Sequence, residues 1–233
     1  MKFIVDGMER SIDVSRLTIA GWTGRDQAAQ QAHIEELQAL GIEPPQSTPV
    51  YYHVGKELLT QDGSIDVVGG NSSGEAEVFL LALDDGIYLG VGSDHTDREL
   101  EAMDITLSKQ NCPKPVSREL WRLSDVVEHW DEITLRSYIV INGERTLYQQ
   151  ASIAALLEPR EIVEKAALDF DNLNTGHAIF CGTVSVIGGI RYGEEYQVEL
   201  VDPVKQRKLS HAYRVRDVNH VRVADHIGSQ AQV

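Results

Sequence analysis

The chain has 233 residues, a formal net charge of −15 and two cysteines. This length fits one compact domain, and the negative charge argues against nucleic acid or an anionic membrane as a partner, because either would need a segregated basic patch. Two cysteines do not make a disulfide framework, and the chain contains neither a signal-like leader nor a run of about 18 apolar residues. We therefore expect a cytoplasmic protein that does not span a membrane.

The first 20 residues predict short β-strands. Lys2–Val5 and Arg10–Val14 flank an Asp6-Gly7 turn, and Leu17–Ala20 follows as a third strand. We expect all three strands to be scaffold.

A helix is predicted at Gln27–Leu40, with Asp26 as its N-cap and Gly41 as its stop. His33 and Glu36 lie three residues apart on this helix, a spacing that suits a general base and the carboxylate that orients it. The alternative, which the residues alone favour, is an ordinary surface pair on a polar helix. After the helix, the sequence predicts a strand at Pro49–Val54 and a loop at Gln61–Ser73.

Two glutamates begin the candidate site. Glu75 and Glu77 open an apolar run, Val78–Leu83, that is typical of a buried strand, and residues two apart in a strand point to the same face. Two ionised carboxylates about 4 Å apart repel by roughly 4 kcal/mol at an effective dielectric constant near 20. Such a pair beside a core must therefore be solvated, share a proton or hold a cation.

A third carboxylate is expected to join this pair. Asp84-Asp85-Gly86 is a turn signal and Ile87–Ser93 is a second strand, so a hairpin would bring Asp94 beside Glu75 and Glu77. Oxygen ligands of this kind suit Mg²⁺, Mn²⁺ or Ca²⁺ rather than zinc or copper.

Two other interpretations of the acidic segment stay open. A Glu-x-Glu pair is often only the solvated end of a strand. His95 and Asp97 would also suit an iron-type facial triad if a second, distant histidine joined them.

The segment resembles motifs of the fumarylacetoacetate hydrolase superfamily. The core of that superfamily has a Glu-x-Glu strand and, some twenty residues later, a Gly-(Asn/Leu/Ser)-Asp-x-(Ser/Thr)-x-Arg-(Asp/Glu) segment, to which Gly92–Glu99 is similar. The likeness continues in Thr106–Lys109 with Cys112-Pro113, in Ile179–Thr183 and in Gly193–Leu200. These matches span roughly residues 17–215 and indicate an uncharacterised branch of the superfamily.

The resemblance implies roles for individual residues. Lys109 matches the active-site lysine of the family, and Arg98 matches the arginine that helps to fix the substrate's carboxylate. His53 stands where the family usually has a lysine, which makes it a candidate substrate contact. Gly182 and Thr183 match the segment that binds the carboxylate or oxyanion of the substrate.

The family also has a His-x-x-Glu pair that activates water from a lid helix, and the resemblance implies this role for His33 and Glu36. Lys114, in contrast to Lys109, is expected to have no part in the reaction.

The rest of the pattern predicts scaffold, and the fold class that follows is α+β. We expect one domain with a mixed, mostly antiparallel, twisted β-roll of the fumarylacetoacetate hydrolase type and short peripheral helices. Within it, residues 1–48 form the N-terminal β segment and lid helix, 49–216 the metal-binding core and 217–233 a tail. The scaffold elements are helices at Leu123–Trp130, Ser152–Leu157 and Pro159–Leu168, and a hairpin of Leu135–Ile141 with Arg145–Gln149 through Asn142-Gly143.

The predicted function is that of an enzyme with Mg²⁺, Mn²⁺ or Ca²⁺ as cofactor that acts on a small 2-oxo or 1,3-dicarbonyl acid. The reaction would pass through a metal-stabilised enolate, and C–C bond hydrolysis is the first choice. Decarboxylation, hydration and isomerisation share this enolate and stay open, as does a non-catalytic metal- or metabolite-binding protein. We expect a homodimer whose partner is the small oxo acid, with no nucleic acid and no membrane.

Overall fold

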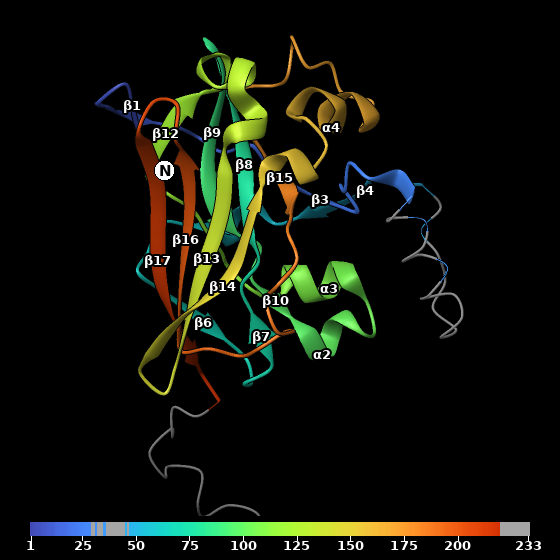
Figure 1. Ribbon diagram of the computed structural model, residues 1–233, viewed down its shortest axis with the longest axis vertical. Helices are drawn as coiled ribbons and strands as arrows, with labels where there is room; N and C mark the ends of the chain where they lie inside the picture. Colours follow the sequence, from blue (N-terminus) through green and yellow to red (C-terminus); the bar gives the residue numbers. More distant parts are fainter. Residues whose placement is uncertain (29–30, 32–34, 36–44, 46, 220–233) are drawn as a thin grey trace, which may run out of the picture.

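The computed structural model describes residues 1–28, 31, 35, 45 and 47–219. In this part of the chain, strands form two large sheets and short helices lie at the periphery (Figure 1). Most strand pairs are antiparallel, although four of the pairs are parallel. The predicted α+β fold class with a mixed, mostly antiparallel β-roll is confirmed.

The larger sheet has eight strands, and its centre is the hairpin that carries the acidic residues. In spatial order the strands are β2 (Met8–Ser11), β1 (Lys2–Val5), β12 (Glu119–Arg122), β9 (Gly86–Ser93), β8 (Ala76–Leu83), β15 (His177–Thr183), β3 (Arg16–Gly21) and β4 (Val50–Val54).

The second sheet has five strands and packs against β8 and β9 of the first. Its hairpin turns at Asn142-Gly143, where both residues have positive φ angles, of 53° and 77°, as a tight two-residue turn requires. In spatial order the strands are β14 (Glu144–Ser152), β13 (Thr134–Ile141), β16 (Glu195–Asp202), β17 (Arg207–Asp217) and β6 (Ser64–Val67).

Strand β8 separates two hydrophobic cores, which explains why its sequence is apolar without alternation. Val78 and Leu80 face the core between the two sheets, together with Leu200 of β16. Phe79 and Leu81 point to the opposite side and pack in the second core. Because both faces of β8 are buried, the strand is held in a fixed position, and so is Glu77 near its start.

The remaining elements are short. Two small strand pairs join β7 (Ser72–Ser73) to β10 (Thr96–Asp97) and β5 (Leu59–Thr60) to β11 (Lys114–Pro115). The helices are α2 (Arg98–Glu101), α3 (Ile105–Gln110) and α4 (Pro159–Lys165), with 3₁₀ turns η1 (Lys56–Leu58), η2 (Leu123–Asp125), η3 (Val127–Glu132) and η4 (Ile153–Ala155).

Several element predictions differ from the structure. The segment Gln61–Ser73 was expected to be a loop, but it contains β6 and β7, which are only four and two residues long and pair with distant strands. The helices predicted at Leu123–Trp130 and Ser152–Leu157 are 3₁₀ turns, and the first of them is interrupted at Val126 and His129, whose φ angles of −123° and −130° are not helical.

Part of the predicted helix Gln27–Leu40 lies outside the described residues. Of those that are described, Gln27, Ala28, Gln31 and Glu35 are helical. In the described part of the chain no helix has the length and apolarity needed to cross a membrane. The division into residues 1–48, 49–216 and 217–233 stays a prediction.

Candidate metal centre

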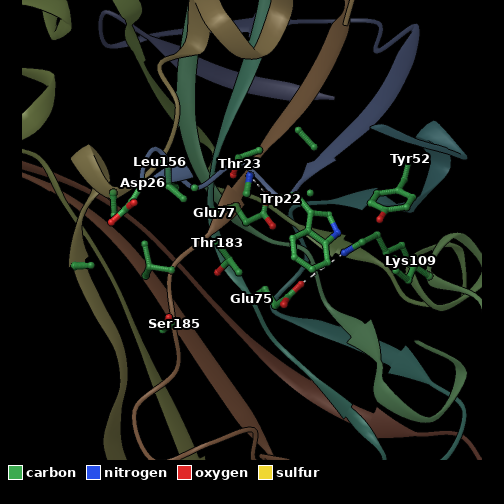
Figure 2. A pocket seen from close by; sticks show the side chains of 18 of the residues that line it. Trp22, Thr23, Asp26, Tyr52, Glu75, Glu77, Lys109, Leu156, Thr183 and Ser185 are labelled. Atoms are coloured by element: carbon green, nitrogen blue, oxygen red, sulfur yellow. Dashed lines mark hydrogen bonds and ion pairs between the residues drawn. The ribbon is translucent and has the colours of Figure 1, made fainter. Parts of the chain in front are cut away.

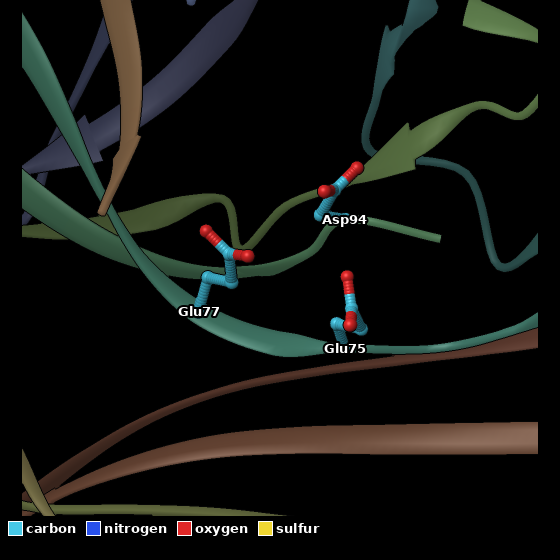
Figure 3. Close-up of side chains that lie close together, drawn as sticks. All are labelled: Glu75, Glu77 and Asp94. Carbon is cyan, nitrogen blue, oxygen red and sulfur yellow. The ribbon is translucent and has the colours of Figure 1, made fainter. Parts of the chain in front are cut away.

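The β8–β9 hairpin brings three carboxylates together (Figure 3). In the hairpin Ala76 pairs with Ser93, and the Asp94 N–H donates to the Glu75 carbonyl at 3.0 Å, so Asp94 lies across from the two glutamates. One carboxylate oxygen from each of Glu75, Glu77 and Asp94 lies within 4.8 Å of the others. The structure thus has the convergence that the turn and strand pattern predicts.

Two of the three carboxylates are almost completely buried. Glu77 is 2% exposed and Asp94 is 0% exposed. Burial, and then the charge of Asp94, raises the pKa of Glu77 well above its usual value. The Gly182 N–H donates to Glu77 Oε2 at 2.8 Å and holds this carboxylate in place.

Cations of the chain itself surround the three acids. The Lys109 ammonium forms a hydrogen bond with Asp94 and lies 3.6 Å from Glu75 Oε2. The Lys114 ammonium lies 3.2 Å from Asp94 Oδ1, and Arg98 lies 3.2 Å from Glu75 Oε1. The three positive side chains therefore form ion pairs with Asp94 and Glu75.

These contacts change the pKa of Lys109 and Asp94 in opposite directions. Burial alone would lower the pKa of Lys109, but the charges of Asp94 and the two glutamates outweigh it and raise the pKa. Burial alone would raise the pKa of Asp94, but Lys109 and Lys114 outweigh it and lower the pKa. Both groups are therefore charged at neutral pH.

The donor set fits a hard divalent cation. All three side chains offer carboxylate oxygens, the ligands that Mg²⁺, Mn²⁺ and Ca²⁺ prefer. Asp94 Oδ1 is buried and has no hydrogen-bond donor among the described residues, although Lys114 is near enough for an ion pair. A buried carboxylate oxygen without a donor is available to a metal ion.

The iron-type alternative built on His95 is not supported. Both ring nitrogens of His95 are engaged, Nδ1 with the Tyr213 hydroxyl at 3.0 Å and Nε2 with Ser72 Oγ at 2.9 Å. Burial, and then the charge of Lys114, lowers the pKa of His95 to about 3. His95 is therefore a neutral, hydrogen-bonded core residue.

The acidic cluster opens into a cavity of about 620 Å³ (Figure 2). Glu75, Glu77 and Lys109 lie on its wall, with the aromatic rings of Trp22 and Tyr52 nearby. The Lys109 ammonium is 5.7 Å from the centre of the Tyr52 ring. A small molecule in this cavity would contact the carboxylates and the ammonium together.

Two residues assigned to substrate binding do not line this cavity. His53 is exposed on β4, where its Nδ1 pairs with Thr18 Oγ1 at 3.1 Å, whereas its neighbour Tyr52 faces the cavity. Arg98 is engaged with Glu75 and Glu101, and its Nε donates to Ser73 Oγ at 2.7 Å. Arg98 therefore contacts Glu75 from outside the cavity and orients its carboxylate.

Gly182 and Thr183 do line the cavity, but their donors are directed to β8. The Gly182 N–H is given to Glu77, and the Thr183 hydroxyl donates to the Ala76 carbonyl at 2.8 Å. Gly182 has a φ of +92°, and a Cβ there would lie 1.9 Å from Thr23 Oγ1, so only glycine fits. Both residues hold the strand of the two glutamates.

Gln149 is a site residue that the sequence prediction missed. It is fully buried on β14, and its Oε1 accepts from the Ala76 N–H at 3.0 Å and from the Ser137 hydroxyl at 2.8 Å. Its Nε2 donates to Thr183 Oγ1 at 2.8 Å and to the Val184 carbonyl at 2.6 Å. Gln149 thus links the second sheet to the strand of the carboxylates.

Lys114, which we expect to have no part in the reaction, is a buried neighbour of the acidic cluster. Lys114 is 0% exposed, and its ammonium donates to the carbonyls of His95 and Cys112 at 2.7 and 2.8 Å and to that of Lys109. Burial lowers its pKa despite the nearby Asp94. Lys114 thus connects the segment Asp94-His95 to the end of α3 through its hydrogen bonds.

His33, the predicted general base, and Glu36, the carboxylate predicted to orient it, lie outside the described residues. Their position relative to the cavity stays a prediction.

A protein-family model described as "Protein of unknown function (DUF2848)" matches residues 20–213. A comparison with curated proteins finds no match.

Solved structures of similar fold cover almost the whole chain. A protein from Oleispira antarctica, provisionally named a fumarylacetoacetate isomerase/hydrolase, is 18% identical and has a TM-score of 0.68, with 93% of this chain and 100% of that chain covered. 2-Hydroxyhepta-2,4-diene-1,7-dioate isomerase from Mycobacterium marinum is 17% identical, with a TM-score of 0.64 and coverage of 91% and 82%.

A third structure is fumarylpyruvate hydrolase from Pseudomonas aeruginosa in complex with Mn²⁺ and pyruvate. It is 15% identical to this chain, with a TM-score of 0.62, and 93% of this chain and 96% of that chain are covered. The resemblance to the fumarylacetoacetate hydrolase superfamily is thereby confirmed at the level of the fold.

Proposed function

The chain belongs to the DUF2848 family, and from its fold and its acidic cavity we propose that it is a divalent-metal-dependent enzyme acting on a small 2-oxo or 1,3-dicarbonyl acid. The proposed reaction is hydrolysis of a C–C bond. The observation that carries the proposal is the convergence of Asp94 with Glu75 and Glu77, because these two glutamates lie on the wall of a cavity that also holds Lys109. A structure of the same fold that contains Mn²⁺ and pyruvate supports it.

Glu75, Glu77 and Asp94 would hold the ion, with Mg²⁺ as first choice and Mn²⁺ or Ca²⁺ as alternatives. The ion supplies a Lewis acid that polarises a carbonyl oxygen of the substrate. Gly182 keeps Glu77 in a fixed orientation, and Arg98 does the same for Glu75. These contacts keep the carboxylates in place before the ion enters.

Lys109 would stabilise the negative charge that develops on the substrate when the C–C bond breaks. Its raised pKa keeps the ammonium charged at neutral pH, so it acts as a fixed positive group rather than as a base. Lys109 is only 6% exposed, and the rings of Tyr52 and Trp22 line the cavity beside it. A charge in a partly dry site stabilises an anion more strongly than the same charge in water.

His33 and Glu36 remain the proposed pair that activates water. A homodimeric assembly, a cytoplasmic location and a choice of hydrolysis over lyase chemistry belong to the same proposal.

Deuterium exchange tests the proposal without knowledge of the physiological substrate. The protein loaded with Mn²⁺ is mixed with pyruvate in D₂O, and deuterium uptake at the methyl carbon is followed by NMR. We expect uptake that depends on Mn²⁺ and falls about a hundredfold in Lys109→Met, the order of loss for one preorganised charge-stabilising group. Uptake at the same rate with the protein omitted would contradict the proposal.

The same assay separates hydrolysis of the C–C bond from proton exchange at the carbon next to the carbonyl. With a cleavable oxo acid, His33→Gln should slow hydrolysis while exchange continues, because exchange does not need an activated water. Full hydrolysis by His33→Gln would exclude this base.

A further inference from the structure

The cavity wall carries a phenol beside the Lys109 ammonium. Tyr52 lines the cavity from β4, where it lies opposite Ile19 of β3. Its neighbour Tyr51 faces the other side of the sheet, where its hydroxyl donates to the Ile162 carbonyl at 2.6 Å. The two adjacent tyrosines therefore differ, because one hydroxyl is engaged outside the cavity while the other belongs to its wall.

The ring of Tyr52 has a defined position. It packs against the backbone of Gly21, where a Cβ atom would lie 3.0 Å from Tyr52 Cε2 and 3.7 Å from the hydroxyl oxygen. The Lys109 ammonium lies 5.7 Å from the centre of the ring and 3.6 Å from Glu75 Oε2. Figure 2 shows the Tyr52 hydroxyl directed toward the side of the cavity where Lys109 and Trp22 lie. Lys109 is thus a neighbour of both the acidic cluster and the phenol.

The surroundings of Tyr52 keep its proton on the oxygen at neutral pH. Burial raises the pKa of Tyr52 above its usual value of about 10, and the charges of Glu101 and Asp94 add to the rise. The charge of Lys109 and the Trp22 indole N–H act in the opposite direction on this pKa. The phenol is therefore neutral, and Lys109 and Trp22 would stabilise the phenolate that remains after it has donated a proton.

The proposed reaction needs a proton donor. Cleavage of the C–C bond leaves an enolate, whose carbon must take up a proton before the product is an oxo acid. Lys109 is poorly suited to give this proton, because the charges of Asp94 and the two glutamates outweigh its burial and raise its pKa. A neutral phenol beside Lys109 can instead act as a general acid.

We propose that Tyr52 is the catalytic acid that donates a proton to the carbon of the enolate. This inference rests on the proposed function. The O–H bond of Tyr52 breaks, a C–H bond forms with the electron pair of the enolate double bond, and the enolate oxygen becomes a carbonyl oxygen. The phenolate that remains beside Lys109 takes a proton back from water. In the reverse direction, the phenolate removes a proton from the carbon next to the carbonyl, which gives hydrogen exchange.

Exchange into 2-oxobutanoate tests the donor. The carbon next to the carbonyl of this acid carries two hydrogens, and a donor on one wall of the cavity reaches one face of the planar enolate. Protein loaded with Mn²⁺ is mixed with 2-oxobutanoate in D₂O, and the deuterium in the acid is counted by mass spectrometry. We expect the wild type to replace one of the two hydrogens and to leave the other in place.

Tyr52→Phe removes the proton donor and keeps the ring. Exchange should fall about a hundredfold, the order of loss for one general acid, and the exchange that remains should replace both hydrogens. Calorimetry should show that the variant binds 2-oxobutanoate about as tightly as the wild type. The matched control is Tyr51→Phe, which removes the hydroxyl bonded to Ile162 and should keep the wild-type exchange rate and the single deuterium.

Lys109→Met distinguishes the phenol from the ammonium. This variant loses the charge that stabilises the enolate but keeps the Tyr52 hydroxyl. Its exchange should therefore be slower than that of the wild type and still be limited to one deuterium per molecule.

The outcomes separate this inference from the proposed function. If Tyr52→Phe exchanges one hydrogen at the wild-type rate, or if its affinity for 2-oxobutanoate falls as much as its rate, Tyr52 is not the proton donor and the proposed function stands. Replacement of both hydrogens by the wild type or by Lys109→Met would also contradict donation from Tyr52. If the wild type catalyses no exchange that depends on Mn²⁺, the proposed function and this inference both fail.

Discussion

The Lys109 ammonium is hydrogen-bonded to the Asp94 carboxylate, so that a cation of the chain itself already pairs with one of the three acids. It also lies 3.6 Å from Glu75. A divalent ion held by Asp94 and Glu75 would share their carboxylate oxygens with this ammonium. Lys109 and the ion are therefore competitors for one set of ligands before they can act together on a substrate.

Replacement of Lys109 should tighten metal binding while it slows the reaction. In Lys109→Met, Mn²⁺ no longer meets the repulsion of an ammonium, and we expect its affinity to rise by about tenfold, or about 1.4 kcal/mol. This is about a third of the roughly 4 kcal/mol between two unit charges 4 Å apart at a dielectric constant near 20. Calorimetric titration measures this. Lys56→Met, which removes a half-exposed surface lysine, is the control and should bind Mn²⁺ as the wild type does. Weaker Mn²⁺ binding by Lys109→Met would contradict the claim that Lys109 and the ion compete for the same carboxylates.

Gln149 should be needed for both stability and metal binding. Gln149→Leu leaves the buried Ala76 N–H and Val184 carbonyl without partners, and we expect the free energy of unfolding to fall by about 2–3 kcal/mol. Since Ala76 separates Glu75 from Glu77, Mn²⁺ affinity should fall as well. Urea unfolding and calorimetry measure the two effects.

Ser137→Ala is the comparison for Gln149→Leu, because it removes one partner of Gln149 and leaves the contacts with Ala76 and Thr183 in place. It should reduce stability less and leave Mn²⁺ affinity unchanged. If Gln149→Leu bound Mn²⁺ as tightly as the wild type, Gln149 would contribute to stability and not to metal binding.

The sequence predicted the parts of the site that depend on local pattern. The two-residue period places Glu75 and Glu77 on one face, and the turn at Asp84-Asp85-Gly86 returns the chain to bring Asp94 beside them. The same hairpin logic predicted the Asn142-Gly143 turn.

Other residues depend on contacts between distant segments. Gln149 acquires its role because β14 lies against β8 and the Thr183 segment, and no local pattern distinguishes it from the exposed Gln150. His53 was assigned from the resemblance alone, and it does not line the cavity, whereas its neighbour Tyr52 does, because neighbours in a strand face opposite sides.

Lys114 should be essential for stability. Lys114→Met removes the ammonium from three buried carbonyls and from Asp94, and we expect the free energy of unfolding to fall by about 3–5 kcal/mol, as for other broken buried pairs. Urea unfolding measures the change, and Lys2→Met, at an exposed pair with Glu9, should have little effect. A variant of Lys114 as stable as the wild type would show that its contacts are not needed.

His177 should make the protein less stable in mild acid. Burial, followed by the charges of Arg16 and His53, lowers the pKa of His177 to about 4, against about 6.5 in the unfolded chain. The unfolded state therefore binds a proton that the folded state does not between these values, and the free energy of unfolding falls as the pH drops from 6.5 to 4. After allowance for solvent screening, we expect about 2 kcal/mol.

The check on His177 is the slope of unfolding free energy against pH. His177→Gln retains a side-chain amide for Thr18, which His177 contacts at 2.9 Å, but it has no proton to bind. Its slope between pH 6.5 and 4 should be shallower than that of the wild type. Identical slopes would assign the acid sensitivity to other groups.

The central claim is that Glu75, Glu77 and Asp94 bind one divalent ion, and calorimetric titration of Mn²⁺ into wild type and Glu77→Gln tests it most directly. The variant keeps the shape of Glu77 and loses its charge, so Mn²⁺ affinity should fall by about a hundredfold or more. Without metal, its free energy of unfolding should not fall, because burial and Asp94 disfavour the ionised form of Glu77. Glu57→Gln, at a glutamate outside the site, should bind one Mn²⁺ per chain as the wild type does. Equal affinity in Glu77→Gln and wild type would contradict the metal centre.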